Sequence, residues 1–429
     1  MKIALLNCNL FDGNKDSELK LVNILLDGEI IEKIVDVSEE LSDEYAKIDL
    51  ENKYVIPGLI NLHSHLFGSG KPSKTLGGKS KKQQMIIKFC GTKLGEKILK
   101  NLVKKHVKEE LYSGVTTLRS SGDFYYSDVI VRDLVNEGKA IGPKMIVPGP
   151  AITVSGGHGD GTFAMTGDSK EELTKLVNLN KDHNVDYIKI CVTGGVMDAK
   201  KKGEPGELKM NLEQTKTICD LAHKYGFKVA SHTESNAGVK VALEGGVDTI
   251  EHGSFIDEED IKMYKKTGAV NVFTISPALP LSKFDSKVTL LDELSIYNSD
   301  VVVKGMIDGA KKCLENDILV GLGTDASCPF ATQYGMWREV YQFAKYVEVS
   351  NKFALYSATL VNAKILNMDK EIGSIEPNKI ADLLILDNNP LEDLEALRDI
   401  DMIINKGTII NNPKIKKNKY IEDKLDTLL

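Results

Sequence analysis

The sequence predicts an α/β protein, a (β/α)8 TIM barrel that carries a small β-sandwich domain formed by both ends of the chain. From residue 57 to residue 364, apolar runs rich in Val, Ile and Thr alternate with longer helical stretches, which is typical of repeated βα units. Residues 1–56 instead contain short strand-like segments separated by turns. Similar segments return within 365–429, so we expect the two ends to build one β-sandwich domain beside the barrel.

The barrel prediction depends on a count of eight apolar, strand-like segments. They lie at 59–65, 115–120, 144–154, 186–193, 228–234, 248–254, 270–276 and 319–325. Polar residues follow closely on these segments. In TIM barrels the catalytic groups come from the carboxyl ends of the strands, so chemistry is expected there.

Composition limits the class of protein and its partners. The chain has 429 residues, of which 42% are apolar and 27% charged, and a formal net charge of -7, which indicates a globular enzyme and not a disordered chain. Basic and acidic residues are interspersed, so we expect small-molecule substrates and no nucleic acid. The chain contains no run of about 18 apolar residues, so we expect no membrane span.

The cysteines and the first residues bear on the compartment. The six cysteines are scattered without a CxxC pair, which fits reduced thiols, and the first residues lack the pattern of a signal peptide. We therefore expect a cytoplasmic protein. The sequence leaves open whether the protein forms a homo-oligomer. Residues 282–300 are expected to serve either as an interface between subunits or as a lid. Residues 68–84, rich in Gly and Lys, are expected to form a loop over the barrel mouth.

A pair of histidines, His63 and His65, is the first candidate for metal binding. Side chains alternate along a strand, so both imidazoles point to one side and Ser64 points away. Imidazole is a common ligand of zinc and similar ions. Alone, the pair could equally be a chance or packing pair.

Further candidates occupy equivalent places at the ends of other predicted strands. His232, His252 and Asp325 each end a strand, and His158 lies in a glycine-rich loop after the third strand, where it could also anchor the loop. Lys189 is charged within an otherwise apolar strand, which is costly unless it is paired with a carboxylate or modified to an anionic carbamate. The remaining histidines lie in or beside helical stretches and are expected at the surface: His106, His183 and His223.

Together these motifs resemble the amidohydrolase superfamily over nearly the whole chain. The matching residues are PGLINLHSH, Lys189, His232, His252, GTDAS and the stretch from Ser357 to Pro390. The resemblance implies two divalent metal ions, most simply zinc. His63, His65 and Asp325 would hold one ion, His232 and His252 the other, and a carboxylated Lys189 would bridge them.

More narrowly, VPGPAITVSGGHGD and ALEGGVDTIEHGSFID resemble the branch that contains Xaa-Pro and Xaa-Arg or Xaa-Lys dipeptidases. That branch implies cleavage of a dipeptide or N-acyl amino acid. Several of its members carry a tyrosine two residues after the fifth-strand histidine, whereas this chain has Glu234. An ionised carboxylate cannot donate a hydrogen bond, so Glu234 would instead receive an amino group of the substrate or form a salt bridge.

The expected mechanism is attack by a metal-activated hydroxide, with Asp325 as proton shuttle and His158 as a donor to the oxyanion. One alternative is a cyclic amide hydrolase or deaminase of the same superfamily, similar to imidazolonepropionase. Those enzymes often use a glutamate three residues after the fifth-strand histidine, and Glu234 follows His232 by only two. The alternative of another class is a non-catalytic scaffold that keeps the fold.

Overall fold

The computed structural model describes residues 2–73 and 81–429. Much of the predicted loop at 68–84 therefore lies outside the described residues. Residues 81–84, the last of this segment, are helical and not a loop, since they begin the first helix, α1 (Lys81–Cys90).

The centre of the molecule is a set of parallel strands in two connected groups. Three strands pair in the order β6-β7-β8, and seven pair in the order β10-β9-β11-β12-β13-β14-β15. Their bounds are β6 (Leu59–Ser64), β7 (Val115–Ser120), β8 (Lys144–Ile146), β9 (Ala151–Thr153), β10 (Ala164–Thr166), β11 (Ile188–Cys191), β12 (Val229–Thr233), β13 (Thr249–His252), β14 (Val270–Phe273) and β15 (Val320–Leu322). The fold is therefore α/β with parallel strands.

The two groups approach each other at both sides. On one side the backbone N–H groups of Thr324 and Asp325 donate to the carbonyl of His63, at 2.9 and 2.8 Å, so the chain after β15 runs beside β6. On the other side the predicted strand 144–154 is not continuous. Pro148 and Pro150 interrupt it, because proline has no N–H to donate to a neighbouring strand. Consequently β8 pairs with β7, and β9 pairs with β11.

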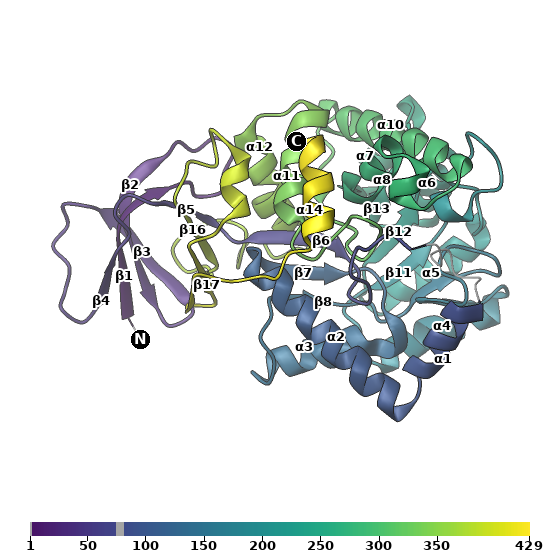
Figure 1. Ribbon diagram of the computed structural model, residues 1–429, viewed down its shortest axis with the longest axis horizontal. Coiled ribbons are helices and arrows are strands. Elements are labelled where there is room, and N and C mark those ends of the chain that lie inside the picture. Colours follow the sequence, from purple (N-terminus) through teal and green to yellow (C-terminus); the bar gives the residue numbers. More distant parts are fainter. Residues whose placement is uncertain (1, 74–80) are drawn as a thin grey trace.

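Strands from the two ends of the chain share a second, eight-stranded sheet. Its order is β18-β17-β16-β5-β1-β2-β3, with β4 paired to β1, and Figure 1 shows the purple N-terminal strands beside β16 and β17. The bounds are β1 (Lys2–Leu10), β2 (Lys20–Asp27), β3 (Ile30–Asp36), β4 (Ala46–Asp49), β5 (Tyr54–Pro57), β16 (Leu383–Leu386), β17 (Met402–Asn405) and β18 (Thr408–Asn411). Strand β16 pairs with β5, so the C-terminal segments return to the N-terminal strands, as we expected.

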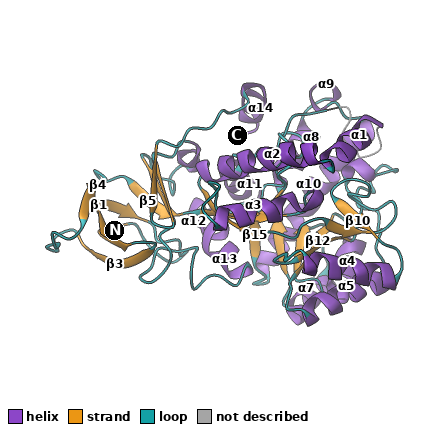
Figure 2. Cartoon of the chain, turned by 90° about the horizontal axis from the view of Figure 1, so that it is seen from below, coloured by secondary structure: helices purple, strands orange, loops and turns teal. Residues whose placement is uncertain are grey.

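Most helices surround the parallel strands (Figure 2), whereas α8 (Ile275–Lys283) lines a cavity at their carboxyl ends. Besides α1 and α8 the helices are α2 (Lys93–Tyr112), α3 (Ser127–Asn136), α4 (Lys170–Asp182), α5 (Leu212–Lys224), α6 (Asn236–Gly245), α7 (Glu258–Thr267), α9 (Ser286–Thr289), α10 (Glu293–Glu315), α11 (Met336–Val347), α12 (Asn351–Tyr356), α13 (Asn362–Ile365) and α14 (Lys419–Leu425). Capping boxes begin α4 at Ser169 and Glu172 and α5 at Asn211 and Gln214, which explains why these two segments read clearly as helices. Within the described residues, we find no helix with the length and hydrophobicity needed to cross a bilayer.

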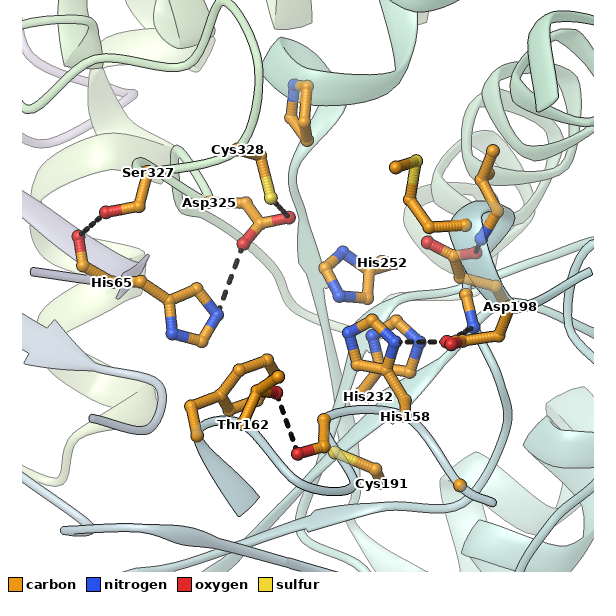
Figure 3. A pocket seen from close by; sticks show the side chains of 18 of the residues that line it. His65, His158, Thr162, Cys191, Asp198, His232, His252, Asp325, Ser327 and Cys328 are labelled. Atoms are coloured by element: carbon orange, nitrogen blue, oxygen red, sulfur yellow. Dashed lines mark hydrogen bonds and ion pairs between the residues drawn. The ribbon is translucent and has the colours of Figure 1, made fainter. Parts of the chain in front are cut away.

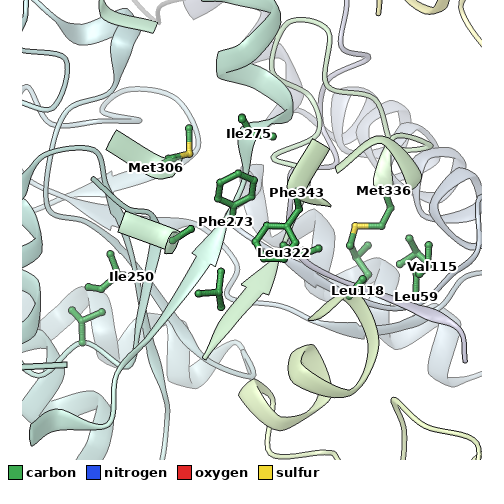
Figure 4. Packing of buried hydrophobic residues seen from close by; sticks show 14 of the residues in the cluster. Leu59, Val115, Leu118, Ile250, Phe273, Ile275, Met306, Leu322, Met336 and Phe343 are labelled. Atoms are coloured by element: carbon green, nitrogen blue, oxygen red, sulfur yellow. The ribbon is translucent and has the colours of Figure 1, made fainter. Parts of the chain in front are cut away.

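Apolar side chains of strands and helices form the main core. Figure 4 shows Leu59, Leu118, Ile250 and Leu322 of the parallel strands together with Phe343 of α11. These side chains are almost completely removed from water. Their packing fixes the strands that carry the polar residues described next.

One histidine prediction is wrong. His106 was expected at the surface, but it is buried within α2, where its Nδ1 lies 2.7 Å from the carbonyl oxygen of Leu66. The reason is helical periodicity, because Val103, His106 and Glu110 fall on the one face of α2 that packs on the strands.

Candidate active site

The predicted site residues converge in one cavity beyond the carboxyl ends of the parallel strands. The cavity is lined by His63 of β6, His65 directly after it, Lys189 of β11, His232 of β12, His252 of β13, Asp325 after β15, His158 after β9 and Glu234 after β12. Figure 3 shows His65, His158, His232, His252 and Asp325 facing this space. The sequence thus brings together residues from six strands.

His63 and His65 lie beside Asp325. The Nε2 atoms of the two histidines lie 3.2 and 3.5 Å from Oδ1 of Asp325. Nδ1 of His65 is 2.8 Å from the carbonyl oxygen of Gly122, which orients the opposite nitrogen toward the carboxylate. Ser64 points the other way, as the alternation of a strand requires, and donates to Glu110 of α2 at 2.7 Å.

His232 and His252 form the other side of the cluster. Their ring centroids are 4.7 Å apart, and the His252 ring is 4.9 Å from that of His63. Nδ1 of His252 is 2.6 Å from the hydroxyl of Thr274. His252 has a left-handed backbone, with φ of 66°, so its side chain joins that of the preceding Glu251 on the inner face instead of alternating with it.

The donor atoms fall into two groups that each suit a metal ion. One group is His63, His252 and Asp325, and the other is His232, Glu234 and His252; within each group the donor atoms lie within 4.8 Å of one another. Burial lowers the pKa of His63 to about 4 and that of His65 to about 3, so these imidazoles are neutral near pH 7, the form that binds metals. Both groups contain only the nitrogen and carboxylate donors that zinc and similar ions accept.

Lys189 is buried at the bottom of the cavity against the carboxylate of Glu251. Burial lowers the pKa of Lys189 to about 7, so a large fraction of the amine is neutral at ordinary pH. Glu251 also lies 2.9 Å from a guanidinium nitrogen of Arg119 and 3.3 Å from Nδ1 of His63. Sequence reasoning missed Glu251 and Arg119, although both are charged residues within apolar strands, the same signal that marked Lys189.

His158 is held in place by Asp198, a residue that sequence reasoning did not identify. Its Nδ1 lies 2.6 Å from a carboxylate oxygen of Asp198, which also accepts the backbone N–H of Gly195. The His158 ring stacks on His232, with centroids 4.0 Å apart and planes 7° apart. The paired Nδ1 leaves Nε2 of His158 available for other contacts.

Glu234 lines the cavity and is fixed through its backbone and one carboxylate oxygen. Its N–H donates to the Thr193 hydroxyl at 3.0 Å, and its Oε2 accepts the N–H of Val196 at 3.1 Å. Burial, together with the nearby charges of Asp325 and Asp198, raises the pKa of Glu234 to about 8. The site thus places this carboxylate among other negative groups.

One wall of the cavity is aromatic, which the sequence did not reveal because its residues are far apart along the chain. Phe67 stacks on Phe163 with centroids 5.8 Å apart, and Phe124 lies 4.7 Å from Phe67. Phe163 in turn lies 4.9 Å from the ring of His65. The cavity therefore offers an apolar surface beside the polar cluster.

Comparison with known proteins agrees with this geometry. The model of the amidohydrolase family matches residues 54–410. The chain belongs to the amidohydrolase family. This confirms the resemblance, and it fits the two donor groups, because the family generally uses divalent metal ions.

Two solved structures resemble this member of the family over almost its whole length. A prolidase candidate from Bifidobacterium longum is 35% identical, covers 99% of this chain and 98% of its own, and superimposes with a TM-score of 0.86. A Xaa-Pro dipeptidase with bound methionine is 27% identical, with coverage of 96% and 100% and a TM-score of 0.82. The structural neighbours are thus prolidase-like and Xaa-Pro dipeptidase-like amidohydrolases.

Sequence relatives are more distant and more varied. An ochratoxinase from Aspergillus niger is 23% identical over 318 residues, which span 68% of this chain and 64% of the ochratoxinase. An imidazolonepropionase from Thermoanaerobacter pseudethanolicus is 26% identical over 80% of this chain and 78% of that protein. The family and these hydrolase relatives identify the protein as a hydrolase that acts on carbon–nitrogen bonds.

Proposed function

We propose that this amidohydrolase is a binuclear metal-dependent enzyme that cleaves the amide bond of a small dipeptide-like substrate. The observation that carries the proposal is that four histidines and Asp325 line one cavity, which is more ligands than one tetrahedral ion needs. We assign His63, His65 and Asp325 to the first ion and His232 and His252 to the second. Zinc is the proposed metal.

We further propose that Lys189 is carboxylated and bridges the two ions. Its amine is buried in the same cavity as the four histidines, and its lowered pKa provides the neutral form that can react with carbon dioxide. Bound divalent ions would offset the negative charge that a carbamate adds beside the carboxylate of Glu251.

Divalent ions at this site supply Lewis acidity, which polarises a carbonyl and makes water a competent nucleophile at neutral pH. Asp325 takes the proton of the attacking water and delivers it to the leaving nitrogen, because its carboxylate stands at the edge of the cluster and within the cavity. His158 donates its Nδ1–H to Asp198, and as an imidazolium, in which both ring nitrogens donate, it also donates from Nε2 to the oxygen that becomes negative.

The arrangement of the chain is part of the proposal. Residues 57–364 would form one closed (β/α)8 barrel, supported by the hydrogen bonds that join the chain after β15 to β6. Residues 1–56 and 365–429 would form the β-sandwich. Its support is a core in which Leu5 and Ile24 pack with Leu383 and Ile404 from the other end of the chain.

Metal analysis and a substrate panel test this proposal. Purified protein should contain close to two divalent ions per chain, and Lys189 should carry the mass or density of a carboxylate. One ion per chain with an unmodified lysine contradicts the binuclear site. The panel should pair dipeptides with cyclic amides, because imidazolonepropionases are among the sequence relatives. Hydrolysis of cyclic amides alone refutes the dipeptidase function.

A further inference from the structure

The charges that line the cavity are unusually one-sided. Its lining includes the carboxylates of Asp160, Asp198, Glu234 and Asp325. Among the described residues that line it, Lys189 is the only lysine or arginine, and it lies at the bottom against Glu251. The walls around a substrate are therefore acidic.

Three of the four carboxylates already have side-chain partners. Asp160 accepts the N–H of Gly156 and the hydroxyl of Thr166. Asp198 pairs with His158, and Asp325 lies between His63 and His65. These three carboxylates shape the loop and the metal cluster.

Glu234 differs from them. Its Oε2 accepts one backbone N–H, from Val196, and among the described residues no hydrogen bond to Oε1 is found. Neither a lysine nor an arginine of the described chain pairs with it, so the salt bridge that the sequence left open is not formed there. The carboxylate is nevertheless held firmly, because Thr193 fixes its backbone.

Glu234 also lies where a substrate reacts. Its carboxylate is within 4.8 Å of the donor nitrogens of His232 and His252. In a peptide the α-amino nitrogen is only about 2.5 Å from the carbonyl carbon, given standard bond lengths and angles. A carbonyl held beside these two histidines therefore brings its α-amino group within reach of Glu234.

We propose that Glu234 binds the α-ammonium group of the residue that supplies the scissile carbonyl. The substrate class is then narrower than dipeptide-like amides in general: it comprises dipeptides and aminoacyl amides with a free amino group. N-acylated amino acids are poor substrates, because an acylated nitrogen carries no positive charge for Glu234 to bind. This inference rests on the proposed function.

The first test compares two substrates on the unaltered protein, an aminoacyl-proline dipeptide and its N-acetyl derivative. We expect kcat/KM to be about 10- to 100-fold higher for the free amine, as is usual for a hydrogen bond between charged groups. Glu234→Gln should remove most of this preference by lowering kcat/KM for the free dipeptide only. Asp160→Asn removes the same charge from the same cavity and should leave the ratio of the two substrates unchanged.

Metal content and binding provide readouts that are independent of turnover. Glu234→Gln should keep the metal content of the wild type, and calorimetry should show weaker binding of a free amino acid but not of its N-acetyl form. Loss of an ion from Glu234→Gln would show that Glu234 is a metal ligand and overturn the inference. If both substrates react equally, only the inference is wrong; if neither reacts, the proposed function fails with it.

Discussion

Gly323 is the position at which a single added methyl group should separate the two strands that hold the first metal group. A Cβ at this position would lie 2.5 Å from Cβ of His63 and 2.6 Å from its backbone nitrogen. Carbon atoms in contact prefer about 3.5–4.0 Å, so Gly323→Ala must move the strands apart by about 1 Å. The methyl group meets backbone here, which a side-chain rotation cannot relieve.

The same displacement breaks the hydrogen bonds that join these strands. The N–H groups of Thr324 and Asp325 now reach the His63 carbonyl at 2.9 and 2.8 Å, and a further 1 Å, roughly, takes them beyond hydrogen-bonding range. Overpacking of this kind and two weakened hydrogen bonds together cost about 3–5 kcal/mol of folding stability. Since metal ligands tolerate shifts of only about 0.5 Å, metal affinity should fall at least about 10-fold.

The assay is metal content and affinity, measured by titration of the metal-free protein alongside thermal unfolding. Gly321→Ala is the matched control on the same strand, where an added Cβ would meet the ends of the side chains of Asn362, Ile365 and Leu62. Ile365 and Leu62 can move their side-chain ends, whereas Asn362 would lose hydrogen bonds to Ile60 and Leu322. This variant should therefore lose stability, but it places no new atom against the backbone of His63 and should bind metal normally. Wild-type metal affinity in Gly323→Ala would refute the argument that Gly323 sets the approach of the two strands.

Three further predictions address charge. Asp325→Asn should lower kcat by about 10²–10⁴-fold while most metal remains bound, because it removes the proton acceptor but not the histidines; full activity would exclude the shuttle. Glu251→Gln should destabilise the protein by about 3–5 kcal/mol in denaturant unfolding, because it leaves a buried arginine without its anion; an unchanged transition would contradict that pairing. Burial raises the pKa of Asp382 to about 6, so the stability that its neutral form contributes below about pH 4 is lost as pH rises through 6. Asp382→Asn should therefore raise Tm at pH 8 and change it little at pH 4, and equal effects at both pH values would exclude the linkage.

Sequence reasoning performed best where a polar residue ends an apolar strand. His63, His232 and Asp325 could be placed together because the carboxyl ends of parallel strands meet at one face of the fold. It performed less well inside the strands. Glu251 and Arg119 form a buried pair between strands, and no periodicity of one segment reveals a partner on another.

Residues that act from loops and helices were harder to foresee. Asp198 orients His158 from a short helical turn 40 residues further along the chain, and neither segment has a pattern that points to the other. His106 is different, since its burial follows from the apolar stripe of α2 and could have been predicted from the spacing of Leu99, Val103 and Val107. Asp198 was missed because only the tertiary structure brings it to His158. The burial of His106 was missed because the helical periodicity of α2 was not fully used.

Two of the site residues depart from regular strand geometry, and that departure explains why strand alternation alone could not order the ligands. His252 and Asp325 have φ values of 66° and 50°, a left-handed conformation that costs a non-glycine residue roughly 1–3 kcal/mol. The cost persists because surrounding contacts fix both residues: Thr274 holds the His252 ring, and the His63 carbonyl holds the backbone of Asp325. A regular strand would turn His252 away from the cavity, since Glu251 already faces inward. The backbone strain therefore lies at the residues where the proposed two-metal site needs it.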